Sequence, residues 1–595
     1  MSAQETFTDL VDVLAKSVAK NRDANLFGVK QDGVWTWTTY GAFAQQVDAL
    51  RGGLASLGIG QGDTVAIIAG NRVEWAVAAY ATYGLGARFC PMYEHQLDSD
   101  RRYIIEDSGA KVVLTSTYAI YETTKSWRSE IPPLEHVLSM SLPAEDAASY
   151  ASLLEIGRRN PVPETAIDPD WVCGFIYTSG TTGRPKGVLL THNNIVSNIN
   201  GVSRFFPIDT RDLSLCFLPW AHSFGQTCEL HFLITRGAAM ALAESMDKLI
   251  DNFSEIKPTI LLAVPRIFNK IYDGLLKRMA EENVVTKSLF AFAMANAERR
   301  EALAAAGRSS GWLDLKHTFF DALVFSKVRA RFGGRLRFAL SGGAALSPDV
   351  ARFIDRLGIF VCEGYGLTET SPIVAANRPG ARKIGSVGQP IPGVEVTIDK
   401  GETGPDAPDG EVVVQGPNVM RGYHALPAET ADVLDAEGRF HTGDLGRLDS
   451  DGYLFITGRI KEQYKLENGK YVVPAPLEEM LQISGFIVQA FIDGANKPFN
   501  VALIVPDRAA LEKWAHGEGI GDSYEAILAH EKTQALMQRE IEAKSKDFRG
   551  YEHVRRFTLI PEEFTIENGL LTPKMSVKRR LVLERYKDQL EELHR

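Results

Sequence analysis

Residues 177–187 read Tyr177-Thr178-Ser179-Gly180-Thr181-Thr182-Gly183-Arg184-Pro185-Lys186-Gly187 and directly follow the apolar run Val172 to Ile176. The apolar run predicts a strand, and the Ser, Thr and Gly residues after it offer clustered hydroxyl and backbone N–H donors. Such donors can hold a polyphosphate without burying a net charge, and Lys186 can add a cation. A flexible linker is the alternative, but the ordered mixture of hydroxyls, Lys and Pro disfavours it. The spacing does not match G-x-x-x-x-G-K-[ST], so a standard P-loop NTPase is also disfavoured.

Short apolar, β-branched runs separated by Gly or Pro recur from residue 65 to about residue 415 and alternate with helical stretches. Parallel α/β units have this pattern. The clearest runs are Val65-Ala66-Ile67-Ile68, Val112-Val113-Leu114, Ile260-Leu261-Leu262-Ala263-Val264 and Leu336-Arg337-Phe338-Ala339-Leu340. Residues 271–331 are rich in Ala, Glu, Lys and Arg and carry no strand signal, which predicts a helical insertion.

After residue 400 the sequence changes from alternating strand and helix signals to strands bounded by turns. Residues 411–414 and 453–457 read as strands bounded by turns such as Asp451-Gly452, which favours a mixed sheet or a distorted β-barrel. Two apolar strands at 486–492 and 499–505, followed by helical residues up to 548, favour a small α+β unit. We therefore predict an α/β fold with a large N-terminal domain of layered α/β sheets plus a distorted β-barrel (1–457) and a small α+β C-terminal domain (458–595).

Composition limits the classes of protein to consider. The chain has 595 residues, of which 45% are hydrophobic and 24% charged, and this length exceeds what one hydrophobic core normally serves. A net charge of -10 gives no overall attraction to nucleic acid or to anionic lipid. We therefore expect no nucleic-acid partner, and any anionic ligand has to be held locally.

Cysteine usage and hydropathy indicate the compartment. The five cysteines are scattered, with no CxxC pair and no metal-ligand spacing to histidine, so neither a disulfide framework nor a zinc site is predicted. The N-terminal residues lack the basic start and apolar core of a signal peptide, and no uninterrupted run of about 18 apolar residues occurs. We expect a cytoplasmic protein that is at most peripheral to the inner face of a membrane; the sequence leaves its oligomeric state open.

Residues 178–187 resemble the signature of the AMP-forming adenylating enzymes, a superfamily of acyl-CoA synthetases, luciferases and nonribosomal-peptide adenylation domains. Further segments resemble that family's other motifs and follow in its order. They are Leu218-Pro219-Trp220-Ala221-His222-Ser223-Phe224-Gly225, Ser341-Gly342-Gly343-Ala344-Ala345-Leu346, Gly364-Tyr365-Gly366-Leu367-Thr368-Glu369-Thr370, His441-Thr442-Gly443-Asp444, Gly458-Arg459-Ile460-Lys461-Glu462, and Leu571-Thr572-Pro573 with Lys578. Their joint occurrence over almost the whole chain makes the resemblance specific.

The resemblance implies an ATP site assembled from these motifs. A flat adenine can lie against a glycine backbone, with Tyr365 offering an aromatic face on the other side. Two oxygens of Asp444 can accept ribose hydroxyls, and Arg459 is the matching cation near ribose or phosphate. The nucleotide-binding set is Thr178, Ser179, Gly180, Thr181, Thr182, Gly183, Lys186, Gly342, Gly343, Ala344, Gly364, Tyr365, Gly366, Asp444 and Arg459.

The resemblance also assigns the chemistry. Thr368 supplies a hydroxyl near the α-phosphate, and Glu369, with Thr181, is placed at a Mg²⁺ ion shared with phosphate oxygens. Lys578 falls on the family's catalytic lysine, where its ammonium bridges carboxylate and α-phosphate oxygens as charge develops. His222 lies where the family has a residue that gates the carboxylate pocket. Taken alone, each of these would be an ordinary surface or structural residue.

By the same resemblance, the C-terminal domain is mobile and rotates about a hinge near Gly458 to serve two half-reactions. Many relatives carry Asp or Lys at this position, and Gly is a departure whose permissive backbone suits a pivot. Gly469 matches a residue beside the pantetheine tunnel for coenzyme A.

The expected activity is ATP-dependent conversion of a medium-to-long-chain fatty acid to acyl-AMP and then to acyl-CoA. The His222 segment lacks the Asp that pairs with an amino-acid ammonium, and residues 264–272 with the helical insertion resemble long-chain synthetases. An aryl or other carboxylate CoA ligase, or an acyl-AMP ligase that loads a carrier protein, remains the alternative.

Overall fold

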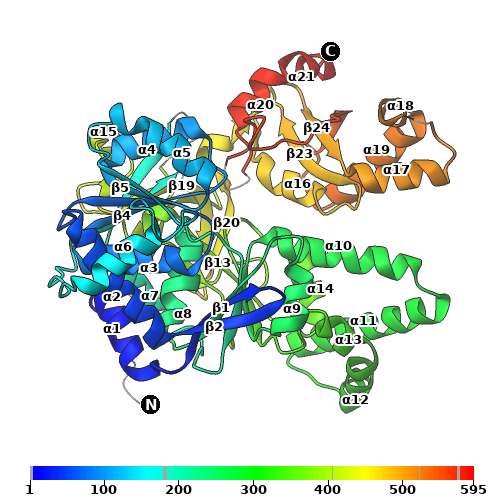
Figure 1. The fold of residues 1–595 in the computed structure, drawn as a ribbon. Helices are drawn as coiled ribbons and strands as arrows, with labels where there is room; N and C mark the ends of the chain where they lie inside the picture. Colours follow the sequence, from blue (N-terminus) through cyan, green and yellow to red (C-terminus); the bar gives the residue numbers. More distant parts are fainter. Residues whose placement is uncertain (1–4, 179–183, 402, 405–406, 522, 573–575) are drawn as a thin grey trace.

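The computed structural model describes residues 5–178, 184–401, 403–404, 407–521, 523–572 and 576–595. Two stacked sheets form most of the large domain, with helices between them and on both outer faces (Figure 1). Alternate residues of single strands enter different cores: Val65 and Ile67 lie between the sheets, whereas Ala66 and Ile68 lie under the outer helices. Strands buried on both faces explain the continuous apolar runs of the sequence.

Both sheets have parallel centres; the first has an antiparallel edge only at its β18–β8 end, and the second has antiparallel edges on both sides. The first has the order β18 (Gly422–Tyr423), β8 (Lys186–Thr191), β7 (Val172–Thr178), β4 (Arg88–Met92), β3 (Thr64–Ile68), β5 (Ala110–Thr115), β6 (His136–Ser139). The second has the order β15 (Gln389–Pro390), β14 (Ile373–Ala376), β13 (Val361–Gly366), β12 (Phe338–Ser341), β11 (Ile260–Ala263), β9 (Leu213–Cys216), β10 (Ala239–Leu242), β1 (Asn25–Gln31), β2 (Val34–Thr39). The parallel α/β units expected from the sequence are confirmed.

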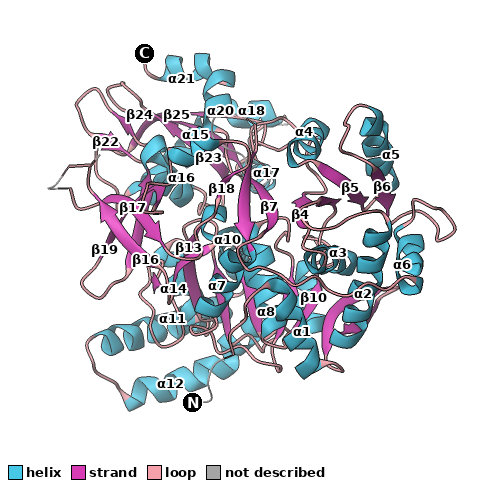
Figure 2. Cartoon of the chain, turned by 90° about the vertical axis from the view of Figure 1, so that its left-hand side faces the viewer, coloured by secondary structure: helices cyan, strands magenta, loops and turns pink. Residues whose placement is uncertain are grey.

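Helices fill three layers around these sheets (Figure 2). Between the sheets lie α1 (Leu10–Asn21), α2 (Tyr40–Ser56), α3 (Val73–Gly84), α7 (His192–Val202), a π-helical segment (Phe224–His231) and α8 (Phe232–Thr235), with α6 (Tyr150–Arg159) packed on α2. The outer layers contain α4 (Asp98–Ser108) and α5 (Tyr118–Ser126) on one side, and α9 (Leu249–Ile256) and α14 (Pro348–Arg356) on the other.

Every secondary-structure element of the predicted insertion is a helix. It comprises α10 (Pro265–Glu281), α11 (Val284–Ala305), α12 (Gly311–Phe320), a π-helical segment (Asp321–Phe325) and α13 (Ser326–Ala330). In Figure 1 these green helices extend to one side of the molecule.

The region expected to form a distorted barrel contains a four-stranded antiparallel sheet. Its order is β16 (Glu395–Asp399), β17 (Gly410–Gln415), β19 (Phe440–Leu448) and β20 (Leu454–Arg459), and α15 (Pro427–Ala431) precedes β19.

The C-terminal elements form a small α+β unit with two hydrophobic cores of their own. These elements are β21 (Tyr464–Lys465), β22 (Tyr471–Val472), α16 (Pro474–Leu481), β23 (Ile487–Asp493), β24 (Asn500–Pro506), α17 (Arg508–Gly517), α18 (Tyr524–Ala529), α19 (Glu531–Ser545), β25 (Val554–Leu559), α20 (Arg579–Arg585) and α21 (Lys587–Leu593). The unit contacts α10, where Lys513 Nζ lies 2.5 Å from Glu281 Oε1, and Ile483 joins the large domain's core. The fold class is as predicted; the exact domain boundary at residue 458 stays a prediction.

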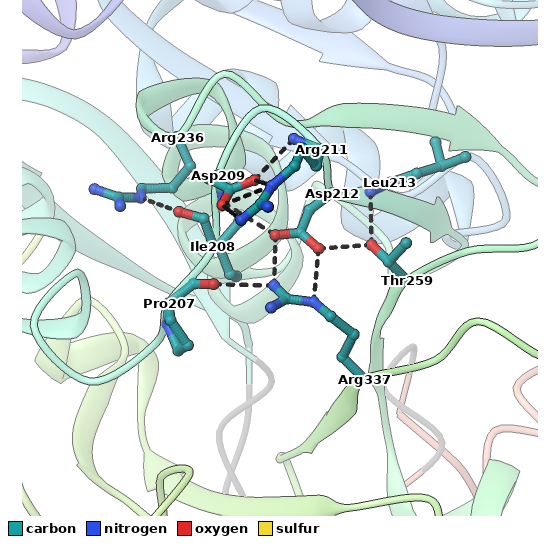
Figure 3. A network of polar contacts seen from close by, with 9 residues as sticks. All are labelled: Pro207, Ile208, Asp209, Arg211, Asp212, Leu213, Arg236, Thr259 and Arg337. Carbon is teal, nitrogen blue, oxygen red and sulfur yellow. Dashed lines mark hydrogen bonds and ion pairs between the residues drawn. The ribbon is translucent and has the colours of Figure 1, made fainter.

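A polar network fastens the amino ends of three neighbouring strands, β9, β11 and β12 (Figure 3). Arg337 binds Asp212 through two nitrogens, Nη2 to Oδ2 at 2.6 Å and Nε to Oδ1 at 3.1 Å. Thr259 Oγ1 donates to Asp212 Oδ1 at 2.7 Å and accepts from Leu213 N. The Asp212 side chain is 2% exposed, so its charge depends on these partners.

We expect Asp212→Ala to destabilise the large domain by about 1.5–3 kcal/mol, because charged hydrogen bonds are lost while Arg337 can rehydrate. Asp209→Ala is the control, since Asp209 pairs with the exposed Arg211 and should cost less than about 1 kcal/mol. Urea unfolding followed by tryptophan fluorescence compares the two variants. Equal shifts of the transition would show that the network does not fasten the strands.

Within the described residues, no helix is both long and apolar enough to cross a membrane.

Candidate active site

The two ends of the expected phosphate loop are held together by β7 and β8. These strands are antiparallel, and Thr178 pairs directly with Lys186. Ser179, Gly180, Thr181, Thr182 and Gly183 lie outside the described residues, so their assigned roles, including Thr181 as a Mg²⁺ ligand, stay predictions. After this gap, the Arg184 guanidinium lies 5.2 Å from the ring centroid of Tyr103 on α4.

Tyr423 connects Lys186 with Glu369. Strand β18 pairs with β8, which places the Tyr423 ring 5.0 Å from Lys186 Nζ. The Tyr423 hydroxyl donates to Glu369 Oε1 at 2.9 Å. Burial and the nearby Glu369 carboxylate raise the pKa of Tyr423, so the phenol keeps the proton that it donates. The structure thus brings two predicted site residues together through one that the sequence analysis did not select.

The His222 segment meets the Thr368 segment. Ser223 Oγ lies 3.2 Å from Thr368 Oγ1, and both side chains are buried. His222 Nδ1 accepts from the backbone N–H of Phe224 at 3.2 Å. Asn71 holds the loop that precedes His222, because its side-chain amide donates to Leu218 O and accepts from Trp220 N.

Glycine is required where the expected adenine segments approach other groups. A Cβ at Gly342 would lie 3.2 Å from the ring of Phe224, and Gly343 has φ +86°. A Cβ at Gly366 would lie 1.8 Å from Pro372 O. Ala344 follows in the same loop, and Gly364 pairs with Ala376 in the β13–β14 ladder. Gly342 and Gly366 therefore allow close packing within the protein, whereas a Cβ at Gly343 would meet only Val264 Cγ1, at 3.7 Å.

Asp444 is the best-defined side chain of the site. Its Oδ2 accepts from the Tyr365 hydroxyl at 2.6 Å, and its Oδ1 lies 2.8 Å from Arg459 Nε. Burial raises the pKa of Asp444, whereas Arg459 and the Tyr365 hydroxyl oppose the shift. The β19–β20 register explains the geometry, because Asp444 pairs directly with Arg459. Three residues predicted to hold the nucleoside therefore lie together.

Lys578 reaches the large domain. It precedes α20, and its backbone N–H donates to Leu570 O at 2.8 Å. Burial raises the pKa of Asp100 on α4, and the positive charge of Lys578 opposes that shift. Asp100 lies one helical turn before Tyr103, and the Arg184 guanidinium stacks on the Tyr103 ring. Lys578 thus approaches the helix that flanks the phosphate-loop segment.

Gly469 is not brought to the site. It lies in the exposed turn between β21 and β22, and the backbone hydrogen bonds of this turn go to other residues of the small domain, such as Leu466 and Lys497. Gly458 has φ +158°, and a Cβ there would lie 2.2 Å from Val473 Cγ1. The present arrangement therefore presents Lys578 to the large domain and leaves the Gly469 turn in solvent.

The profile of the family described as "AMP-binding enzyme" matches residues 14–424, and that described as "AMP-binding enzyme C-terminal domain" matches residues 461–595. The chain belongs to the AMP-binding enzyme family.

Curated relatives of this AMP-binding enzyme span most of its length. Peroxisomal long chain acyl-CoA synthetase 7 of Arabidopsis thaliana is 33% identical, over 93% of this chain and 81% of its own. Long-chain-fatty-acid–CoA ligase FadD15 of Mycobacterium tuberculosis is 35% identical, over 95% of this chain and 93% of its own.

Solved structures share the fold. An anthranilate CoA ligase in complex with anthranoyl-AMP gives a TM-score of 0.75 at 19% identity, covering 99% of both chains. The adenylation domain of a carboxylate reductase from Mycobacterium chelonae gives 0.79 at 23% identity, covering 98% of this chain and 91% of that domain.

The AMP-binding enzyme also contains positioning residues that the sequence analysis missed. Glu411 Oε2 lies 2.8 Å from His441 Nδ1, and Glu411 Oε1 accepts from Gly443 N at 2.9 Å. Glu411 thereby fixes the turn that presents Asp444. Its strand gave no signal beyond an apolar run, because the partner turn is 30 residues away in sequence.

Two carboxyl groups connect the adenine segment of the AMP-binding enzyme to the small domain. Burial raises the pKa of Glu363 on β13 and of Glu479 on α16 to about 8 each. Hydrogen bonds from the backbone of Leu346 to Glu363 and of Ala345 to Glu479 oppose these shifts. Helix α16 therefore contacts the loop that begins at Gly342.

We expect Asp444→Ala to weaken ATP binding by about 1.5–3 kcal/mol, because the ribose hydroxyls would lose the charged acceptor of their hydrogen bonds. Isothermal titration of ATP measures the effect, and Asp432→Ala, at an exposed aspartate on the end of α15, is the control. An unchanged dissociation constant for ATP would remove Asp444 from the nucleotide site.

Proposed function

We propose that this enzyme joins a medium-to-long-chain fatty acid to coenzyme A. ATP first converts the carboxylate to acyl-AMP with release of pyrophosphate, and the thiol of coenzyme A then displaces AMP. The proposal is supported by the names of the relatives, which are long-chain acyl-CoA synthetases and ligases over most of this chain. The observation that carries it is the buried Asp444, held by Tyr365 and Arg459 beside segments that bear Thr368, Glu369 and Lys186.

In this proposal the residues divide the work of the first half-reaction. Asp444 and Arg459 hold the ribose side of ATP, and the Gly342 segment lies along the adenine. Lys186 and Lys578 offset negative charge as the fatty carboxylate attacks the α-phosphorus in line and pyrophosphate leaves. Thr368 donates a hydrogen bond to an α-phosphate oxygen, and His222 borders the entrance for the carboxylate.

Glu369 fits a Mg²⁺ ion. Its carboxylate is oriented by Tyr423 and offers hard oxygen ligands of the kind that this ion prefers. When bound, Mg²⁺ would neutralise charge on the phosphate oxygens. Thr181 is proposed as the second protein ligand.

In the second half-reaction, the Gly469 turn is proposed to lie beside the pantetheine arm of coenzyme A. Because that turn is exposed here and Lys578 is docked, the proposal requires the small domain to rotate, and Gly458 is the proposed hinge. A cytoplasmic location, a peripheral contact with a membrane and the absence of a nucleic-acid partner also remain proposals.

Purified enzyme supplied with ATP, Mg²⁺ and palmitate, octanoate or benzoate, each with and without coenzyme A, tests the function. We expect palmitoyl-CoA and pyrophosphate, detected by mass spectrometry and a coupled pyrophosphate assay. A preference for benzoate would favour an aryl ligase. Acyl-AMP that accumulates without thioester in the presence of coenzyme A would favour an enzyme that loads a carrier protein.

A further inference from the structure

Exposed apolar side chains are concentrated on the helical insertion. Among the described residues, fifteen large apolar side chains are exposed, and eight of them lie between residues 276 and 323, in less than a tenth of the chain. The eight are Leu276, Val284, Val285, Phe292, Trp312, Leu315, Phe319 and Leu323. Exposed apolar side chains that are concentrated in one region can mark an interaction site.

Helix α12 turns an apolar face to solvent. Trp312, Leu315 and Phe319 are 65%, 63% and 58% exposed, and Leu323 follows in the next helical segment. Their spacing of three or four residues puts them on one side of the helix. No residue of α12 is fully buried, although Asn296 on α11 donates to the backbone of Leu313 and holds the helix in place. We call the four exposed residues the α12 face.

The segment from α11 to Arg335, which carries the α12 face, has a charge opposite to that of the chain. Residues 284–335 contain nine Lys or Arg and four Asp or Glu, in a protein of net charge -10. The four acids are Glu298, Glu301, Asp314 and Asp321, and each is paired with an arginine. In contrast, the exposed Lys287, Arg308, Lys316 and Lys327 have no carboxylate within 4 Å among the described residues.

Lysine also borders the apolar residues themselves. Lys316 lies beside the α12 face, with its ammonium 4.9 Å from the Trp312 ring centroid. A helix with Trp, Phe and Leu on one side and lysine at its margin has the composition of helices that lie in the interface of a bilayer. The ammonium can reach headgroup phosphates while its stem stays beside the aromatic ring.

We propose that the α12 face lies on the surface of an anionic lipid bilayer, with its aromatic and leucine side chains among the acyl chains and its lysines at the headgroups. The occupant is a bilayer rather than a second copy of the chain, because the unpaired charges of this region are positive and a symmetric contact would bring them together. The relevance to catalysis, though not the binding itself, rests on the proposed function: a fatty acid dissolved in a bilayer would be delivered to the enzyme at that surface.

Flotation of the full-length enzyme with vesicles tests the proposal. Phosphatidylcholine vesicles with and without phosphatidylglycerol are compared for the wild type, Trp312→Ser/Phe319→Ser, Lys316→Glu and the control Tyr118→Ser/Ile250→Ser, whose exposed apolar residues lie elsewhere. We expect the wild type and the control to float with the anionic vesicles. The face variant should bind at least about tenfold more weakly, and Lys316→Glu should lose the preference for phosphatidylglycerol.

Two outcomes would overturn the proposal. One is equal vesicle binding by the face variant and the control, with both folded by circular dichroism. The other is a wild-type dimer in sedimentation velocity that the face variant converts to a monomer while neither binds vesicles, which would assign the face to a second copy. Acyl-CoA formation from octanoate and from palmitate in the absence of vesicles separates this test from that of the function. It should be the same in the face variant and the wild type, and its absence from both proteins with both acids would reject the activity without affecting vesicle binding.

Discussion

Lys578→Ala is expected to reduce adenylate formation by a factor of about 10²–10³ or more, while thioester formation from pre-formed acyl-AMP stays close to wild type. The magnitude is that of removing one preorganised group that offsets charge in a transition state. The structural reason is that the positive charge of Lys578 is near enough to α4 to oppose the rise in the pKa of Asp100, and Tyr103 on the same helix stacks with Arg184. ATP–pyrophosphate exchange measures the first half-reaction, and consumption of synthetic acyl-AMP with coenzyme A measures the second.

Arg580→Ala is the matched control for this variant. Arg580 belongs to the same basic cluster but is exposed and pairs with Glu584 at 2.6 Å on the outer face of α20. It should leave both half-reactions unchanged. If Lys578→Ala lowered both half-reactions in equal proportion, the lysine would have a structural role rather than the one proposed.

Gly469→Trp is expected to have the opposite effect to Lys578→Ala: it should spare adenylate formation and impair thioester formation. The turn around Gly469 is exposed, and the nearest side-chain atom to a Cβ at this position is Lys465 Cε at 3.8 Å, so the indole should be tolerated in the arrangement seen here. Pyrophosphate exchange should therefore persist. When the small domain rotates and brings this turn beside the pantetheine arm, the indole would block the thiol, and we expect thioester formation to fall by about 10²-fold or more.

Gly469→Ala separates bulk from backbone strain, because Gly469 has φ +84° and any L-residue there is strained. Alanine introduces the strain without the bulk and should retain most of the thioester activity. If alanine and tryptophan were equally harmful, or if tryptophan also abolished exchange, the proposed rotation would have to be abandoned.

The sequence was sufficient to predict the features that depend on local pattern. The apolar runs at residues 65–68 and 260–264 became buried parallel strands because a strand covered on both faces needs apolar residues throughout. The insertion formed helices because it is rich in Ala, Glu, Lys and Arg, which favour helices.

Long-range pairing explains what the sequence could not supply. Tyr423 reaches Glu369 only because a two-residue strand returns to pair with β8, more than 230 residues earlier in the chain. The electrostatic effect of Lys578 on Asp100 of α4 depends likewise on how the two domains dock. A basic cluster in a sequence does not distinguish Lys578 from its neighbours. The motif resemblance located Asp444 and Arg459, but their pairing with each other required the β19–β20 register.

The contact between α16 and the Gly342 loop has a thermodynamic consequence. Ala345 donates its backbone N–H to Glu479 of the small domain, and Glu363 lies close enough to that carboxyl for the two to interact. A ligand that rigidifies this loop changes the free energy of docking the small domain, and docking changes the affinity for that ligand by the same factor. Because of this reciprocity, nucleotide binding in the adenine slot would change the position of the small domain, and docking of the small domain would change nucleotide affinity. A fluorescent label on α16 would therefore be able to report nucleotide binding at a distance.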